Sequence, residues 1–170
     1  ETYNIGGKNE RNNLYIANAD ALVKFNYTEG MTQVNGSYTK VVDLPAGINH
    51  HWTKNVIAGR NGNLFVTVGS NSNVGENGMD IEKDRATILE VNPNTKTYNV
   101  YASGLRNPNG MVIEPTTGVL WTVVNERDQL GGDLVPDYLT SVQKGGFYGW
   151  PYYYYRNHID SRIERPAPDL

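Results

Sequence analysis

The sequence predicts an all-β protein, and its internal repetition favours a β-propeller. Of the 170 residues, 18 are Gly and 12 are Tyr, a mixture that suits short strands and frequent turns better than helices. The stretch Val56–Val68 aligns without a gap with Val112–Val124. Each copy reads as an apolar strand, a turn with Gly, and a strand rich in β-branched and aromatic residues. The segment Leu14–Asn18 resembles the second of these strands.

A further hairpin is predicted between the two clear copies, from Ala86–Val91 and Tyr98–Ala102 joined through Asn92–Thr95. Four short strands recurring at about fifty residues are typical of a propeller blade. At this spacing the chain holds about three blades, whereas closed propellers have about 4–8. A β-sandwich is the alternative, because it also uses short strands and Gly turns.

No linker, charge tract or low-complexity segment divides the chain, so residues 1–170 are treated as one region of a partial propeller. Three blades leave strand edges unpaired. We therefore expect the remainder of the same protein, or a second copy in a homo-oligomer, to complete the ring.

Composition excludes several classes of function. The formal net charge is −3 and no basic run is present, so a nucleic-acid groove is not expected. No stretch approaches the ~20 apolar residues that a membrane-spanning helix needs. Cysteine is absent, which excludes disulfides and thiolate metal sites.

Two polar clusters stand next to predicted strands. In Ala102–Gly110 a strand is predicted to end and to present Arg106, Asn107 and a stiff turn formed by Pro108 and Gly110. A guanidinium is a planar, permanent cation that suits a carboxylate, and an amide adds a donor and an acceptor beside it. The second cluster, His50–Thr53, precedes the earlier strand pair.

Four motifs in order carry a resemblance to a known family: His51–Asn55, Leu64–Gly69, Gly104–Gly110 and Gly145–Pro151. With this order and spacing the chain resembles the glucose/sorbosone dehydrogenases, which are six-bladed propellers that use pyrroloquinoline quinone (PQQ). The resemblance runs from about residue 14 to residue 155 and is closer to the sorbosone dehydrogenase-like branch. It implies a small-molecule sugar substrate, an external electron acceptor and a periplasmic or secreted protein.

The resemblance also implies roles for particular residues. His51 matches the family's catalytic histidine, which removes the proton of the sugar hydroxyl, and Arg106 and Asn107 match residues that hold PQQ. Where the soluble glucose dehydrogenases have an aspartate, this chain has His50, and where they have a basic residue it has Asn55. His50 is the alternative base if the register is shifted.

Calcium is the second cofactor that the resemblance implies. In the family a loop matching residues 125–138 supplies backbone carbonyls to the ion, and here these would come from Asp128 and Gln129. Asp133 and Asp137 are further candidate ligands, because calcium prefers six to eight oxygen ligands and tolerates irregular loops. A solvated polar loop is the alternative.

Two other functions remain open. One is a non-catalytic propeller that binds carbohydrate or a partner, and the other is a calcium-dependent hydrolase of the lactonase type. A lactonase should gather carboxylate and amide side chains on calcium and lack a basic clamp. The polar stretch Asn71–Asp80 could line a substrate entrance, and Tyr152–Tyr155 could stack on sugar rings or divide between core and surface.

Overall fold

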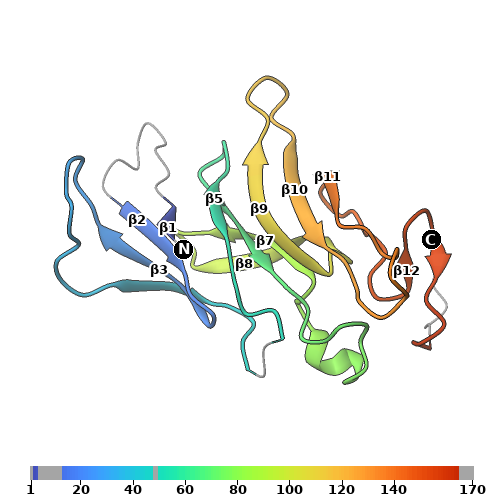
Figure 1. The fold of residues 1–170 in the computed structure, drawn as a ribbon. Coiled ribbons are helices and arrows are strands. Elements are labelled where there is room, and N and C mark those ends of the chain that lie inside the picture. Colours follow the sequence, from blue (N-terminus) through green and yellow to red (C-terminus); the bar gives the residue numbers. More distant parts are fainter. Residues whose placement is uncertain (1, 4–12, 48–49, 165–170) are drawn as a thin grey trace.

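The computed structural model describes residues 2–3, 13–47 and 50–164. They form antiparallel sheets connected in chain order (Figure 1). The first sheet consists of β1 (Thr2–Tyr3), β2 (Asn13–Ala17), β3 (Ala21–Asn26) and β4 (Thr39–Asp43), and the second of β5 (Val56–Ala58), β6 (Leu64–Val68), β7 (Thr87–Asn92) and β8 (Thr97–Ser103). The third has the order β11 (Tyr138–Val142), β10 (Leu120–Asn125), β9 (Asn107–Ile113), and a small hairpin joins β12 (Tyr153–Tyr154) to β13 (His158–Ile159).

The all-β prediction is confirmed. The two aligned repeats fall on β5–β6 and β9–β10, and the predicted intervening hairpin is β7–β8. The single short helix among the described residues is the 3₁₀ turn η1 (Met79–Glu82), and none of them forms a helix that could cross a membrane.

The second sheet lies between the other two and is covered on both faces. All five residues of β6 are buried. Val66 and Leu89 belong to a cluster shared with Leu22 of the first sheet, whereas Phe65 packs in a second cluster with Leu120 of the third. Fully burying a side chain of this size stabilises the folded state by about 1.5–3 kcal/mol relative to leaving it exposed. These two clusters fix the sheets against one another and therefore fix the loops at their ends.

The predicted turn at Pro108–Gly110 is wrong, because these residues lie inside β9. Val124 pairs with Pro108, Val123 with Asn109 and Thr122 with Met111, so Gly110 is the extra residue of a β-bulge. Its φ of +54° suits glycine. Proline is tolerated because β9 is an edge strand of its sheet.

The outer face of the third sheet is apolar and exposed. Val112 on β9 and Leu139 on β11 are 58% and 63% exposed, and Val123 between them is exposed as well. Side chains of this type normally pack against another layer.

Candidate functional site

The strongest candidate site is built around His51, where the segment before β5 crosses the end of β6. Nδ1 of His51 lies 3.0 Å from the carbonyl oxygen of Ser70 and 3.0 Å from its hydroxyl oxygen. The Ser70 hydroxyl donates its own proton to the carbonyl of Ser72, at 2.6 Å. Both Ser70 oxygens therefore act as acceptors, so Nδ1 carries the imidazole proton and Nε2 keeps a free lone pair.

The surroundings of His51 keep its ring neutral. Burial lowers its pKa to about 4, and the positive charges of Arg106 and His50 act in the same direction. At neutral pH the ring is therefore neutral, with its single proton on Nδ1, and can accept a second proton at Nε2. His50 is exposed and packs edge-on against the His51 ring, with 4.4 Å between centroids.

Gly69 brings Asn107 up against His51. A Cβ atom at Gly69 would lie 2.5 Å from Oδ1 of Asn107 and 2.5 Å from Cβ of His51, so any side chain there would push the two apart. Oδ1 of Asn107 is buried and has no hydrogen-bond partner among the described residues. The two residues predicted from sequence thus meet over a glycine, and a buried acceptor lies beside the base.

Arg106 holds the loops of the site together. Its side chain is buried, and Nε donates to the Asn73 carbonyl at 3.0 Å while Nη1 donates to the Glu126 carbonyl at 2.7 Å. Nη2 donates to Oδ1 of Asn73 at 2.9 Å and lies 3.4 Å from the Asp128 carboxylate. The sequence predicts that the Arg106 cation faces a ligand. In the structure most of the N–H donors of Arg106 instead donate to protein oxygens.

The Asp128 contact is the weakest of these and decides whether a cofactor carboxylate fits. Its 3.4 Å length is at the limit of a hydrogen bond, and the Asp128 side chain is 76% exposed. A carboxylate of PQQ could replace Asp128 on Nη2 without disturbing the other Arg106 contacts. The buried Oδ1 of Asn107 offers an acceptor nearby, so these residues fit the cofactor.

Sequence reasoning missed Asn73, which connects the parts of the site. Its side-chain oxygen accepts from Arg106 and from the backbone of Asp128 at 2.9 Å, and its carbonyl accepts from the Trp150 indole at 3.0 Å. Of the predicted entrance loop, residues 71–75 are buried and residues 76–80 are exposed. Glu82 holds the buried half, because it accepts from the Asn71 amide and the Ser72 hydroxyl. The only sequence signal of this half is a run of polar residues, which also suits an exposed loop.

The loop after β10 does not fit calcium as it is folded here. The Asp128 carbonyl accepts from the guanidinium of Arg162 at 2.9 Å and from the Asn73 amide at 3.3 Å. Gln129 and Asp133 are exposed, and Asp137 caps the backbone amide of Glu126. Within the described ranges no three His, Asp or Glu side chains gather as a metal site requires. The predicted calcium site therefore needs Arg162 to leave the Asp128 carbonyl.

Comparisons with known proteins identify a family and several relatives. The family model described as TrAA12-like matches residues 4–152. The curated aldose sugar dehydrogenase YliI of Escherichia coli is 33% identical over 116 residues, which cover 61% of this chain and 29% of that protein. An uncharacterized protein of Borreliella burgdorferi is 29% identical over 110 residues, 64% of this chain and 28% of that protein.

Solved structures share the fold. A Trichoderma reesei carbohydrate-active enzyme of family AA12 superposes with a TM-score of 0.73 at 20% identity, covering 84% of this chain and 41% of that one. The PQQ-bound aldose sugar dehydrogenase of Streptomyces coelicolor gives a TM-score of 0.57 at 22% identity, covering 82% and 43%. The chain thus spans less than a third of the length of the curated relatives it matches.

Proposed function

Because this chain belongs to the TrAA12-like family, we propose that its protein is a PQQ-dependent sugar dehydrogenase in which His51 removes the proton of the sugar hydroxyl. One observation carries the proposal: Ser70 fixes the proton of His51 on Nδ1, which leaves Nε2 as a base. The aldose sugar dehydrogenases among its relatives support the substrate class.

The chemistry divides between the cofactor and the chain. When bound, PQQ supplies the acceptor for the hydride that leaves the sugar carbon, and an external electron acceptor takes the electrons afterwards. His51 takes the hydroxyl proton at Nε2, so one proton and one hydride leave the alcohol and a carbonyl forms. Arg106 would hold a cofactor carboxylate through Nη2, and Asn107 would accept from a cofactor donor.

We further propose that the three sheets are three blades of a six-bladed propeller. The order of the strands within each sheet and the apolar outer face of the third sheet support this arrangement, because that face suits a following blade. The sorbosone-like specificity and a periplasmic or secreted location belong to the same proposal, on the resemblance alone. The proposal includes calcium as a second cofactor on one condition: the guanidinium of Arg162 must first leave the carbonyl of Asp128.

The test compares His51→Gln with His50→Gln in the intact protein. We expect His51→Gln to lower turnover of an aldose by roughly 10²–10⁴-fold, since general-base catalysis contributes about that much. The absorption change on adding PQQ should remain, because neither substitution alters Arg106 or Asn107. His50→Gln should have the smaller effect.

The outcomes separate the parts of the proposal. Near-normal turnover of His51→Gln would remove His51 from the mechanism, and the reverse ranking of the two variants would assign the base to His50. An unchanged PQQ spectrum on titration of the wild-type protein would argue against the cofactor itself.

A further inference from the structure

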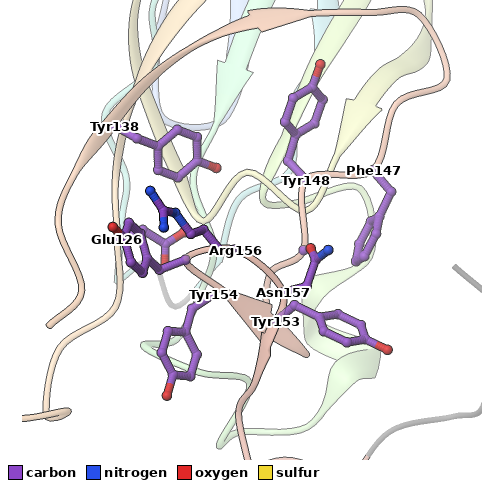
Figure 2. A pocket seen from close by; sticks show the side chains of 10 residues that line it. Glu126, Tyr138, Phe147, Tyr148, Tyr153, Tyr154, Arg156 and Asn157 are labelled. Atoms are coloured by element: carbon purple, nitrogen blue, oxygen red, sulfur yellow. The ribbon is translucent and has the colours of Figure 1, made fainter.

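A second hollow, separate from the His51 site, lies beside the β12–β13 hairpin (Figure 2). Its volume is about 350 Å³, within the range of small-molecule pockets. Three parts of the chain form its walls: Glu126 after β10, Tyr138 at the start of β11, and the segment from Phe147 to Asn157. Neither His51 nor Ser70 lines it.

Six aromatic residues contribute to these walls: Tyr138, Phe147, Tyr148, Tyr153, Tyr154 and Tyr155. The rings of Tyr154 and Tyr155 stack on His158, which does not line the hollow, so a ligand would meet chiefly the rings of Phe147 and Tyr138. The Tyr148 ring is held in place, since its hydroxyl donates to the Ser141 carbonyl at 2.8 Å and accepts from the Gln143 amide at 2.9 Å. Phe147 is 39% exposed and so presents part of its ring to a ligand. Aromatic faces suit the apolar C–H faces of a sugar ring.

The polar groups of the pocket match a neutral polyol. Figure 2 shows the Tyr138 hydroxyl directed toward the space between the walls. This hydroxyl is shielded and has no hydrogen-bond partner among the described residues. Burial, together with the negative charge of Glu126, raises the Tyr138 pKa, so the hydroxyl keeps its proton and can donate. Arg156 and Asn157, which are exposed, add a cation and an amide, and the carboxylate of Glu126, which is paired with buried Arg127, adds an acceptor.

The fully buried side chain of Arg127 connects two walls of the pocket. Arg127 pairs with Glu126 and with Asp160, each at 3.0 Å, and donates to the carbonyls of Pro151 and Tyr153. These contacts tie the wall after β10 to the wall from the hairpin. A preformed pocket loses less conformational freedom on binding than a flexible one.

The hairpin loop that lines the pocket is strained. Tyr155, Arg156 and Asn157 have φ values of 23°, 57° and 68°, in the left-handed region that non-glycine residues rarely adopt. Three such residues in succession are unusual, and strain of this kind clusters at binding sites.

We propose that this pocket binds a pyranose sugar without oxidising it, as a site additional to the His51 site. The inference is independent of the proposed function, because no residue that it uses belongs to the base or to the cofactor contacts. A pyranose offers hydroxyls that accept from Tyr138 and Arg156 and donate to Glu126, and C–H faces for the rings.

The test is calorimetric titration of the intact protein, without PQQ, with methyl β-D-glucopyranoside, a pyranose that lacks a free C1 hydroxyl. We expect Phe147→Ala to weaken binding roughly 10-fold and Tyr138→Phe roughly 3-fold or more. Two control variants should leave the Kd for the glucoside unchanged. They are Tyr38→Ala, at an exposed tyrosine next to the first sheet, and His51→Gln. Tyr138→Phe should not lower the melting midpoint, because it removes a buried hydroxyl that has no partner.

Several results would overturn the proposal. One is the absence of any heat of binding with the wild-type protein, and another is an unchanged Kd in both Phe147→Ala and Tyr138→Phe. A third is loss of binding in His51→Gln alone, which would place the sugar at the His51 site. Binding of choline in place of the glucoside would mean that the rings enclose an organic cation. Binding that fails while His51→Gln behaves as expected would leave the proposed function intact.

Discussion

Nδ1 of His51 lies 3.0 Å from both the carbonyl and the hydroxyl oxygen of Ser70, and both oxygens accept. This contact selects the imidazole tautomer whose free lone pair is on Nε2. The same backbone segment connects the base to Arg106, because the Ser70 amide donates to the Arg106 carbonyl at 2.7 Å. The base and the cationic residue are therefore positioned by one residue at the end of β6.

The first prediction concerns the acid limit of activity. Burial beside Arg106 lowers the His51 pKa to about 4, so kcat/KM should stay high as pH falls and drop only near pH 4. The positive charge of His50 contributes to that lowering. His50→Gln should therefore shift the acid limb to higher pH, whereas His158→Gln, at an exposed histidine, should not move it. A wild-type limb at the ordinary histidine value of about 6.5 would contradict the buried, neutral base.

The strands could be predicted from sequence because their signals are local. The repeat at Val56–Val68 predicts β5 and β6 through its apolar residues and its turn glycine, and the same pattern predicts β9 and β10. The edge position of β9 depends on pairing with β10 alone, which no local pattern reveals. For that reason the local pattern of Pro108 and Gly110 predicts a turn, whereas in the fold Pro108 pairs with Val124 and Gly110 is the bulge residue.

The candidate site was only partly predictable. The resemblance identified His51 and Asn107, which the fold brings together over Gly69. It did not identify Asn73, because its partners Arg106 and Asp128 are 33 and 55 residues away in sequence. Polar residues that satisfy buried groups resemble solvated loop residues until their partners are known.

The second prediction concerns Arg106. Arg106→Ala leaves the buried carbonyl of Glu126 without its donor and removes one of the two donors to the carbonyl of Asn73, and losing buried hydrogen bonds to a charged group costs about 1.5–3 kcal/mol. We therefore expect the free energy of unfolding, measured with urea, to fall by about that amount. The matched control is Arg60→Ala, because Arg60 is exposed and donates only to backbone carbonyls of a turn, so its loss should cost below about 1 kcal/mol. Equal stability of the two variants would mean that Arg106 is available to a ligand rather than structural.

The third prediction concerns Lys54, whose side chain is buried next to the His51 segment. It is 2% exposed, and Nζ has no hydrogen-bond partner among the described residues. Burial, aided by the positive charge of Arg85, lowers the pKa of Lys54 to about 8 from its ordinary value of 10.5. Between these values the unfolded chain binds the proton and the folded chain does not, so stability should rise with pH from about 8 to 10.5.

Replacing Lys54 tests whether its buried amino group causes this dependence of stability on pH. Lys54→Met keeps the length of the side chain and removes the buried ammonium, so it should stabilise the protein at pH 7 by about 1–3 kcal/mol. The rise in stability at alkaline pH should disappear in this variant, whereas Lys83→Met, at an exposed lysine, should retain it. Chemical denaturation at a series of pH values measures both effects. A destabilised Lys54→Met variant would indicate that Nζ has a partner in the intact protein.

The last prediction concerns calcium. The Arg162 guanidinium donates to the carbonyl of Asp128 and is paired with the Asp160 carboxylate at 2.7 Å, so it occupies the position that the predicted ion requires. Two positive charges cannot share one carbonyl oxygen at that distance without a large repulsion. If calcium binds this loop, Arg162→Ala should tighten calcium binding, measured by calorimetry on the metal-free protein, by roughly 10-fold or more. The control is Arg156→Ala, which removes an exposed arginine that does not contact the loop. Calcium binding that is equally tight in wild type and both variants would place the ion elsewhere in the protein, and no binding in any of them would remove calcium from the Asp128 loop altogether.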